Sequence, residues 1–107
     1  MQKSDRIQFL ENLKLELPDD PFAWYALQLE KVGDSPETGL SGWQEIVEKF
    51  PEYLPIYYQI GKAYLSHNQP EKAIELFSAG IALAEKQQDH HTLAELKSAR
   101  MNALLDD

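Results

Sequence analysis

The residues whose types and spacing could do chemistry lie near the carboxyl end of the chain, where Asp89 precedes two adjacent histidines. His91 and Glu95 are four residues apart, so on a helix their side chains would lie on one face, a spacing that can hold a metal ion. The sequence has no second pair of this kind, and His67 is distant along the chain. We therefore interpret the segment as the polar start of a helix and predict no bound metal.

Other catalytic patterns are missing from the sequence. It contains no cysteine, which excludes disulfides, thiolate zinc sites and a cysteine nucleophile. None of its carboxylates stands in an acid–base pattern, and no serine lies in a nucleophile elbow. Gly33, Gly39 and Gly42 do not form a phosphate-binding loop. We expect a protein that is not an enzyme and that uses no cofactor.

The charge balance narrows the class of partner. Ten basic residues stand against 18 acidic ones, for a net charge of −8, whereas nucleic-acid-binding proteins need a basic surface. Anionic membrane surfaces are disfavoured for the same reason, and the polar N-terminus lacks the apolar run of a signal peptide or membrane span. We expect a cytoplasmic protein that binds neither nucleic acid nor membranes.

The negative charge is unevenly distributed along the chain. Residues 20–53 contain seven carboxylates and two lysines, whereas residues 54–87 contain three of each. An acidic surface keeps a protein soluble, and it also attracts a basic partner. The sequence leaves both interpretations open.

Six helices joined by short loops must position these residues. Apolar residues recur at helical spacing, and Pro, Gly and Asp mark the joints. The expected helices run from Ser4 or Asp5 to just before Pro18, from Pro21 to Gly33-Asp34, from Ser35-Pro36 to Pro51, from about Leu54 to His67, from Pro70 onward and from Asp89 onward.

The sequence also repeats itself at a spacing of 34 residues. Pro36-Glu37-Thr38-Gly39-Leu40 aligns with Pro70-Glu71-Lys72-Ala73-Ile74, and at the same offset Trp43 falls on Phe77. A fixed period of about 34 residues is typical of stacked pairs of antiparallel helices. Because one pair cannot bury its apolar face alone, the flanking segments must cover the ends.

Residues 54–87 resemble one complete tetratricopeptide repeat. The family pattern has a large aromatic residue, Leu-Gly and Tyr on the first helix, then small, aromatic and small residues on the second. It is matched at seven positions by Tyr57, Ile60, Gly61, Tyr64, Ala73, Phe77 and Gly80. Gly61 and Ala73 would let the two helices approach, and Tyr64 and Phe77 would fill the groove beside them.

Residues 20–53 resemble the same pattern in their second helix and depart from it in their first. Gly39, Trp43 and Pro51 stand at the small, aromatic and closing positions. The positions of the large aromatic, Gly and Tyr are instead occupied by Ala23, Leu27 and Glu30. The chain as a whole is similar to small bacterial tetratricopeptide repeat proteins without assigned function.

The resemblance implies an all-α fold, a right-handed solenoid of antiparallel helix pairs in a single domain. Residues 1–19 would form an N-terminal helix, residues 20–53 and 54–87 two repeats, and residues 88–107 a capping helix. A terminal cap needs a polar outer face. This one would be supplied by Asp89, His90, His91, Glu95, Lys97, Ser98 and Asn102.

The resemblance also implies a concave groove lined by the first helix of each repeat. The groove-facing side chains would be Trp24, Gln28 and Lys31 in one repeat and Tyr58, Lys62 and Leu65 in the other. The aromatic rings would supply apolar contact, and the lysines would pair with acidic groups of a ligand. The alternative is that Trp24 and Tyr58 pack against flanking helices as core residues.

We therefore expect a protein–protein interaction module or scaffold that binds a peptide or a protein surface and performs no catalysis. A second hypothesis is structural. Only two repeats are recognisable, and at least about three are typical, so the chain could form a homodimer through the same surface or through an end helix.

Overall fold

The computed structural model describes residues 2–33 and 35–106, in which all regular secondary structure is helical and no strand occurs. Asp34, expected at the end of the second helix, lies outside the described residues. The all-α fold predicted from the sequence is confirmed. The elements are α1 (Lys3–Glu16), α2 (Pro21–Val32), the 3₁₀ helix η1 (Pro36–Thr38), α3 (Leu40–Lys49), α4 (Pro55–Ser66), α5 (Pro70–Gln87) and α6 (His90–Leu105).

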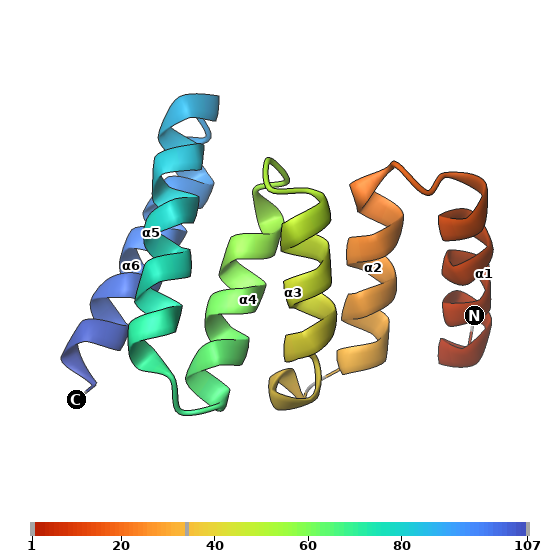
Figure 1. Ribbon diagram of the computed structural model, residues 1–107, viewed down its shortest axis with the longest axis horizontal. Helices are drawn as coiled ribbons and strands as arrows, with labels where there is room; N and C mark the ends of the chain where they lie inside the picture. Colours follow the sequence, from red (N-terminus) through yellow and green to blue (C-terminus); the bar gives the residue numbers. More distant parts are fainter. Residues whose placement is uncertain (1, 34, 107) are drawn as a thin grey trace.

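The helices form an elongated solenoid. Figure 1 shows α1 to α5 side by side in chain order, with α6 behind α5 and the two termini at opposite ends. The principal-axis extents are 40 × 29 × 23 Å. Because the connecting loops are short, successive helices run antiparallel. None of the described helices has the length and apolar character needed to cross a lipid bilayer.

Proline begins three of the helices, as the sequence predicts. Pro21, Pro55 and Pro70 are the first residues of α2, α4 and α5. Proline fits this position because the backbone N–H it lacks would have no partner inside the helix. Pro21 and Pro55 are 34 residues apart, so the first helix of each repeat begins with the same local chemistry.

Aspartate side chains cap two of the helices. Asp20 accepts a hydrogen bond of 3.0 Å from the backbone N–H of Phe22 at the start of α2. Asp89 accepts one of 3.0 Å from the backbone N–H of Thr92 and one of 2.9 Å from the Thr92 hydroxyl. These two bonds stabilise the carboxylate and hold the pKa of Asp89 below its usual range. The polar start predicted for the last helix is thus an N-cap.

Ser4 or Asp5 was expected to cap the first helix, but the helix begins two or three residues earlier. Its N-cap is Gln2, which makes no side-chain capping bond, and Ser4 and Asp5 lie inside the first turn. The backbone N–H of Arg6 already donates to the Gln2 carbonyl at 3.0 Å. Asp5 remains favourable there because a carboxylate in the first turn interacts well with the helix dipole.

The hydrophobic core is centred on α4 and α5. Gly61 of α4 faces Phe77 of α5, and a Cβ on Gly61 would overlap the Phe77 ring. Gly80 has the same role one turn further along α5, where a Cβ would lie 2.7 Å from the Cβ of Tyr57. The largest side chains that are almost fully buried are Trp43, Phe77, Ile56, Ile60 and Leu96.

The third helix begins later than predicted. Ser35-Pro36 leads into η1, and α3 starts only at Leu40, after Gly39 with φ −108° and ψ 2°. Gly39 is closely packed, since a Cβ there would overlap the side chain of Val32. Glycine is a poor helix former, and here it allows the chain to turn where another helix passes. Gly39 is therefore the N-cap of α3 rather than an interior residue.

The first repeat packs differently from the second. α4 packs extensively against α5, whereas α2 packs more extensively against α1 than against α3. Gln28 stands between α2 and α3, and its amide occupies the space that a Cβ of Gly42 would fill. Ala23 and Leu27, which depart from the family pattern, are the buried residues of α2. The departures therefore lie in the helix whose packing differs.

The two terminal helices expose apolar side chains. α1 contributes no buried residue, and its Leu15 is 80% exposed. At the other end Leu105 of α6 is 74% exposed. The residues predicted to form the polar outer face of α6 are also exposed, except Asp89, which is half-buried at the N-cap; the exposed ones are His90, His91, Glu95, Lys97, Ser98 and Asn102. Both ends therefore carry polar and apolar surface together.

Candidate peptide-binding surfaces

The first candidate surface is one face of α4. Tyr58 and Lys62 are four residues apart and half-buried, and the Lys62 Nζ lies 5.0 Å from the centroid of the Tyr58 ring. Leu65, almost one turn further on, is exposed and lines a hollow of about 420 Å³ with Asn68 and Ala103. The three residues predicted on this helix therefore share one face, as their spacing requires.

The Gln28 side chain is hydrogen-bonded within the protein and is not free to line an open groove. Its Nε2 donates a hydrogen bond of 3.0 Å to the carbonyl of Gly39. This carbonyl also accepts the backbone N–H of Trp43 at the start of α3. Gln28 thus ties α2 to the first turn of α3, and its amide is already used in that contact.

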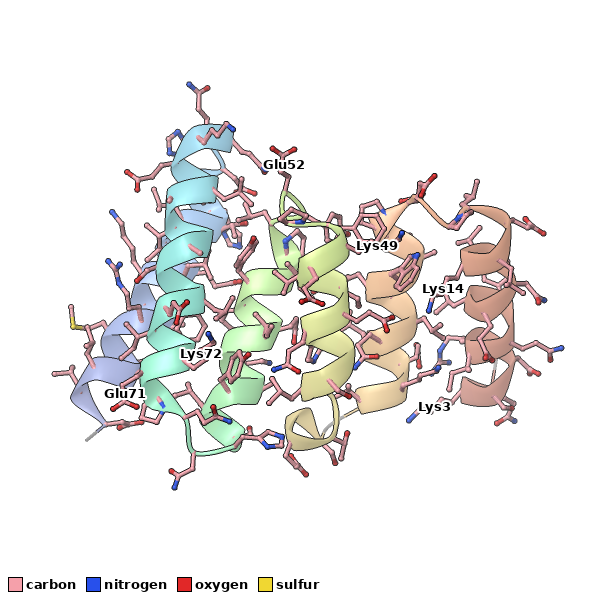
Figure 2. All side chains as sticks on the ribbon, viewed as in Figure 1. Lys3, Lys14, Lys49, Glu52, Glu71 and Lys72 are labelled. Carbon is pink, nitrogen blue, oxygen red and sulfur yellow. The ribbon has the colours of Figure 1, made fainter. Side chains whose placement is uncertain are left out.

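Trp24 packs against both neighbours of α2. Its indole Nε1–H donates a 2.9 Å hydrogen bond to the carbonyl of Pro18, and its ring meets Phe50 edge-on at a centroid distance of 5.8 Å. Two ammonium groups lie over the ring, that of Lys14 from α1 at 3.8 Å and that of Lys49 from α3 at 5.5 Å. Figure 2 shows Lys14 and Lys49 extending toward α2 from its two sides.

Lys31 lies in the same region as Trp24. The two residues are seven positions apart, about two turns, so they lie on one face of α2. They line a cleft of about 360 Å³ together with Leu27 of α2, Pro18 and the α1 residues Glu11, Lys14 and Leu15. We call this the Trp24 cleft.

The six predicted residues thus fall into two groups with different neighbours. Tyr25 is the α2 residue that reaches α4, because Gln59 Nε2 donates to its hydroxyl at 3.3 Å. Successive side chains on a helix point about 100° apart, so Trp24 is turned away from this contact, toward α1 and the end of α3. Trp24 and Tyr58 are both partly buried and pack against the hydrophobic core, as the packing alternative describes.

The repeat spacing of the sequence contains a signal for the Tyr25–Gln59 contact, which the family pattern does not include. The two residues are 34 positions apart, so they are equivalent in successive repeats. The Tyr25 ring also packs on Tyr53 with centroids 5.5 Å apart and on Trp43 at 5.7 Å. Burial raises the pKa of Tyr25 above its usual value, and the charge of Glu95 on α6 adds to the effect.

Lys14 and Lys49 were not predicted as site residues. Neither belongs to the first helix of a repeat, so the family groove gave no reason to select them. Their approach to Trp24 depends on how α1 and α3 flank α2. The only indication from the sequence was the alternative prediction that Trp24 packs against the helices on either side of it.

Comparison with solved structures identifies the family. A crystal structure of a tetratricopeptide repeat domain protein from Salinibacter ruber is 32% identical, with a TM-score of 0.75, and the match covers 82% of this chain and 100% of that one. The chain belongs to the tetratricopeptide repeat family. A solution NMR structure of a tetratricopeptide repeat domain protein from Salinibacter ruber is 34% identical, with a TM-score of 0.71 and coverage of 80% and 88%. No protein-family model and no curated protein matches the sequence.

The histidines of this tetratricopeptide repeat protein make local contacts. His91 Nε2 lies 3.9 Å from Glu95 Oε2, with the imidazole almost fully exposed. His67 Nε2 lies 2.6 Å from the carbonyl of Glu37, which joins the end of α4 to η1. Within residues 2–33 and 35–106, no group of three potential metal-binding side chains comes together.

Proposed function

We propose that this tetratricopeptide repeat protein is a cytoplasmic interaction module that binds a peptide or protein surface on the exposed face of α4, without catalysis and without binding nucleic acid. Membership of the family supports a role in protein interaction. The single observation that carries the choice of surface is the pairing of Tyr58 with Lys62. An aromatic ring and an ammonium group 5.0 Å apart offer apolar contact and a charge in one place.

The surface is small, and it lies beside a hollow at the ends of α4 and α6. Interfaces of limited area typically give micromolar affinity. The two long side chains keep part of their surface in solvent, so they are available to a ligand. The hollow that Leu65 lines would accommodate an apolar side chain of that ligand.

Affinity capture from the native lysate tests the proposal. Immobilised wild-type protein is compared with the Tyr58→Ala/Lys62→Ala variant, and captured proteins are quantified by mass spectrometry. We expect the variant to lose a specific captured protein while its circular dichroism spectrum stays helical. A Lys86→Ala variant, altered at an exposed residue of α5, controls for a general charge effect. Equal capture by all three proteins would contradict the assignment of this face.

Self-association is the second candidate, and the exposed apolar side chains of both end helices favour it. Leu15 on α1 and Leu105 on α6 are the two most exposed large apolar residues described. If they bury each other between copies, light scattering will show a mass that rises with concentration, and Leu15→Glu or Leu105→Glu will restore the monomer. A monomeric wild-type protein at all concentrations would remove this candidate.

A further inference from the structure

We propose that the Trp24 cleft is a separate binding site that accepts an extended acidic segment of a partner protein, with apolar residues between its carboxylates. This inference goes beyond the α4 surface proposed above and does not depend on it. The two sites share no lining residue, since the cleft is built from α1, α2 and the loop between them. Three features of the cleft support the inference. The Trp24 ring is held in place, the nearby lysines form no ion pairs among the described residues, and the wall is apolar.

The Trp24 ring is held in place by contacts with the protein. The hydrogen bond to Pro18 fixes the indole N–H, and Phe50, the residue after α3, supports the ring. Lys14 and Lys49 then approach the ring from two different helices. A tryptophan ring attracts cations through its quadrupole, which accounts for the approach of both ammonium groups to Trp24.

These ammonium groups are not neutralised by neighbouring side chains. Among residues 2–33 and 35–106, no ion pair includes Lys14, Lys31 or Lys49. Lys14 and Lys31 line the cleft, and Lys49 approaches the Trp24 ring from α3. These lysines give the site a positive charge, although the whole chain has 18 acidic and ten basic residues. A ligand with carboxylates complements this group, and basic or neutral ligands do not.

The wall of the cleft adds apolar surface. Leu15 is 80% exposed, and it lines the cleft with Leu27 and Pro18. Glu11 is the one carboxylate among the described lining residues, so Lys14 and Lys31 leave the cleft with net positive charge. A volume of about 360 Å³ is at the low end for a small-molecule pocket, and this open cleft fits one or two side chains of an extended chain. Alternating acidic and apolar residues match both features.

Two synthetic peptides test the site, one alternating Glu with Leu and one alternating Gln with Leu. Each carries fluorescein and has about ten residues, which in extended form span roughly 33 Å. Fluorescence anisotropy should show saturable binding of the Glu peptide and at least about tenfold weaker binding of the Gln peptide, because only the former pairs with the lysines. Added salt should weaken the Glu peptide more.

The two tryptophans allow the site to be located by NMR. The sequence has two indole N–H groups, and Trp43 is only 1% exposed. The Glu peptide should shift the indole signal of Trp24 and leave that of Trp43 in place. Binding without movement of the Trp24 signal would overturn the proposal, and so would the absence of saturable binding up to about 1 mM.

Charge reversal provides a matched pair of variants. Lys14→Glu/Lys49→Glu reverses the two charges that lie over the Trp24 ring, of which only Lys14 is a lining residue of the cleft. Lys86→Glu/Lys97→Glu makes the same change of net charge at exposed lysines of α5 and α6. We expect the first to weaken Glu-peptide binding at least about tenfold and the second less than about threefold. Lys14→Gln/Lys49→Gln is a milder second variant that should also weaken binding.

Two further outcomes would overturn the proposal. Equal loss of binding in the two charge-reversed variants would mean that only the total charge matters. Dissociation of a dimer by Lys14→Glu/Lys49→Glu, seen by light scattering, would mean that a second copy occupies the cleft. The Tyr58→Ala/Lys62→Ala variant should bind the Glu peptide normally, so failure of the α4 surface and failure of this site can be told apart.

Discussion

Gly61 of α4 lies directly against the ring of Phe77 on α5, with no room for a side chain between them. Phe77 is fully buried, so its ring cannot move into solvent to relieve a clash. The contact sets how closely the two helices of the second repeat approach. It also explains why a residue with a low helix propensity stands in the middle of α4.

Gly61→Ala should therefore destabilise the fold. Overpacking a full core costs about 1–3 kcal/mol or more, whereas alanine recovers only about 1 kcal/mol through its higher helix propensity. Urea denaturation followed by circular dichroism measures the difference in the free energy of unfolding. Gly42→Ala is the comparison. Its Cβ would meet the end of the Gln28 side chain, which can move at the cost of its hydrogen bond to Gly39, so we expect a smaller loss than at Gly61. A stabilised Gly61→Ala protein would contradict the close approach.

Tyr57→Phe should weaken the junction between α3 and α4. The Tyr57 hydroxyl donates a 2.5 Å hydrogen bond to the carbonyl of Pro51, and burial raises the pKa of this hydroxyl. Loss of the bond should lower the free energy of unfolding by about 1 kcal/mol. Thermal denaturation can compare it with Tyr53→Phe, which we expect to stay within about 0.5 kcal/mol of wild type. Equal effects would argue that the Tyr57 hydroxyl is not specifically bonded.

Asp89→Asn should make the stability less sensitive to acid. The folded-state pKa of Asp89 is lowered by its bonds to Thr92, so the cap contributes stability above the usual aspartate pKa. This contribution is lost as the pH falls from about 5 through the lowered folded-state value. Asparagine also caps helices well but does not titrate.

Urea midpoints at pH 7 and at low pH measure this effect. The wild-type protein should lose more stability between the two conditions than Asp89→Asn does. Asp19→Asn, at an exposed aspartate before the start of α2, serves as the control and should behave like wild type. The same acid sensitivity in all three proteins would show that the Asp89 cap is not the source.

Trp24→Ala should loosen α1 selectively. α1 has no buried residue. Trp24 contacts Lys14 of α1 and Pro18 in the loop that follows it. Arg6 also donates to Glu30 at 2.8 Å, which lowers the pKa of Glu30, but exposed ion pairs contribute little. Hydrogen exchange followed by mass spectrometry should therefore rise in α1 and remain low in α5. A uniform rise along the chain would contradict this.

The second repeat could be predicted from sequence nearly residue by residue. Its pattern residues contact one another, Gly61 with Phe77 and Gly80 with Tyr57, so their spacing within the repeat predicts their packing. The starts at Pro55 and Pro70 follow from proline chemistry that needs no tertiary information. The period of 34 residues then implied that the remaining helices would stack.

The first repeat could not be predicted to the same depth, because its contacts depend on elements outside the repeat. Ala23 and Leu27 are buried on α2, the helix that packs more on α1 than on α3, which the family pattern does not describe. Trp24 was assigned to a groove by its position in the repeat, yet its neighbours Lys14 and Lys49 come from α1 and α3. Gly39 was likewise predicted to lie inside a helix, because its contact with Val32 of α2 cannot be read from the local sequence.

The thin contact between α2 and α3 has a mechanical consequence. Of the consecutive α-helices, α2 and α3 pack least extensively and α4 and α5 much more so. The α2–α3 boundary is crossed by the hydrogen bond from Gln28 to Gly39 and by a few aromatic ring contacts. A force along the long axis would therefore be expected to separate α2 from α3 first. Small rotations at the same place would change the curvature of the whole array with little disturbance inside either half.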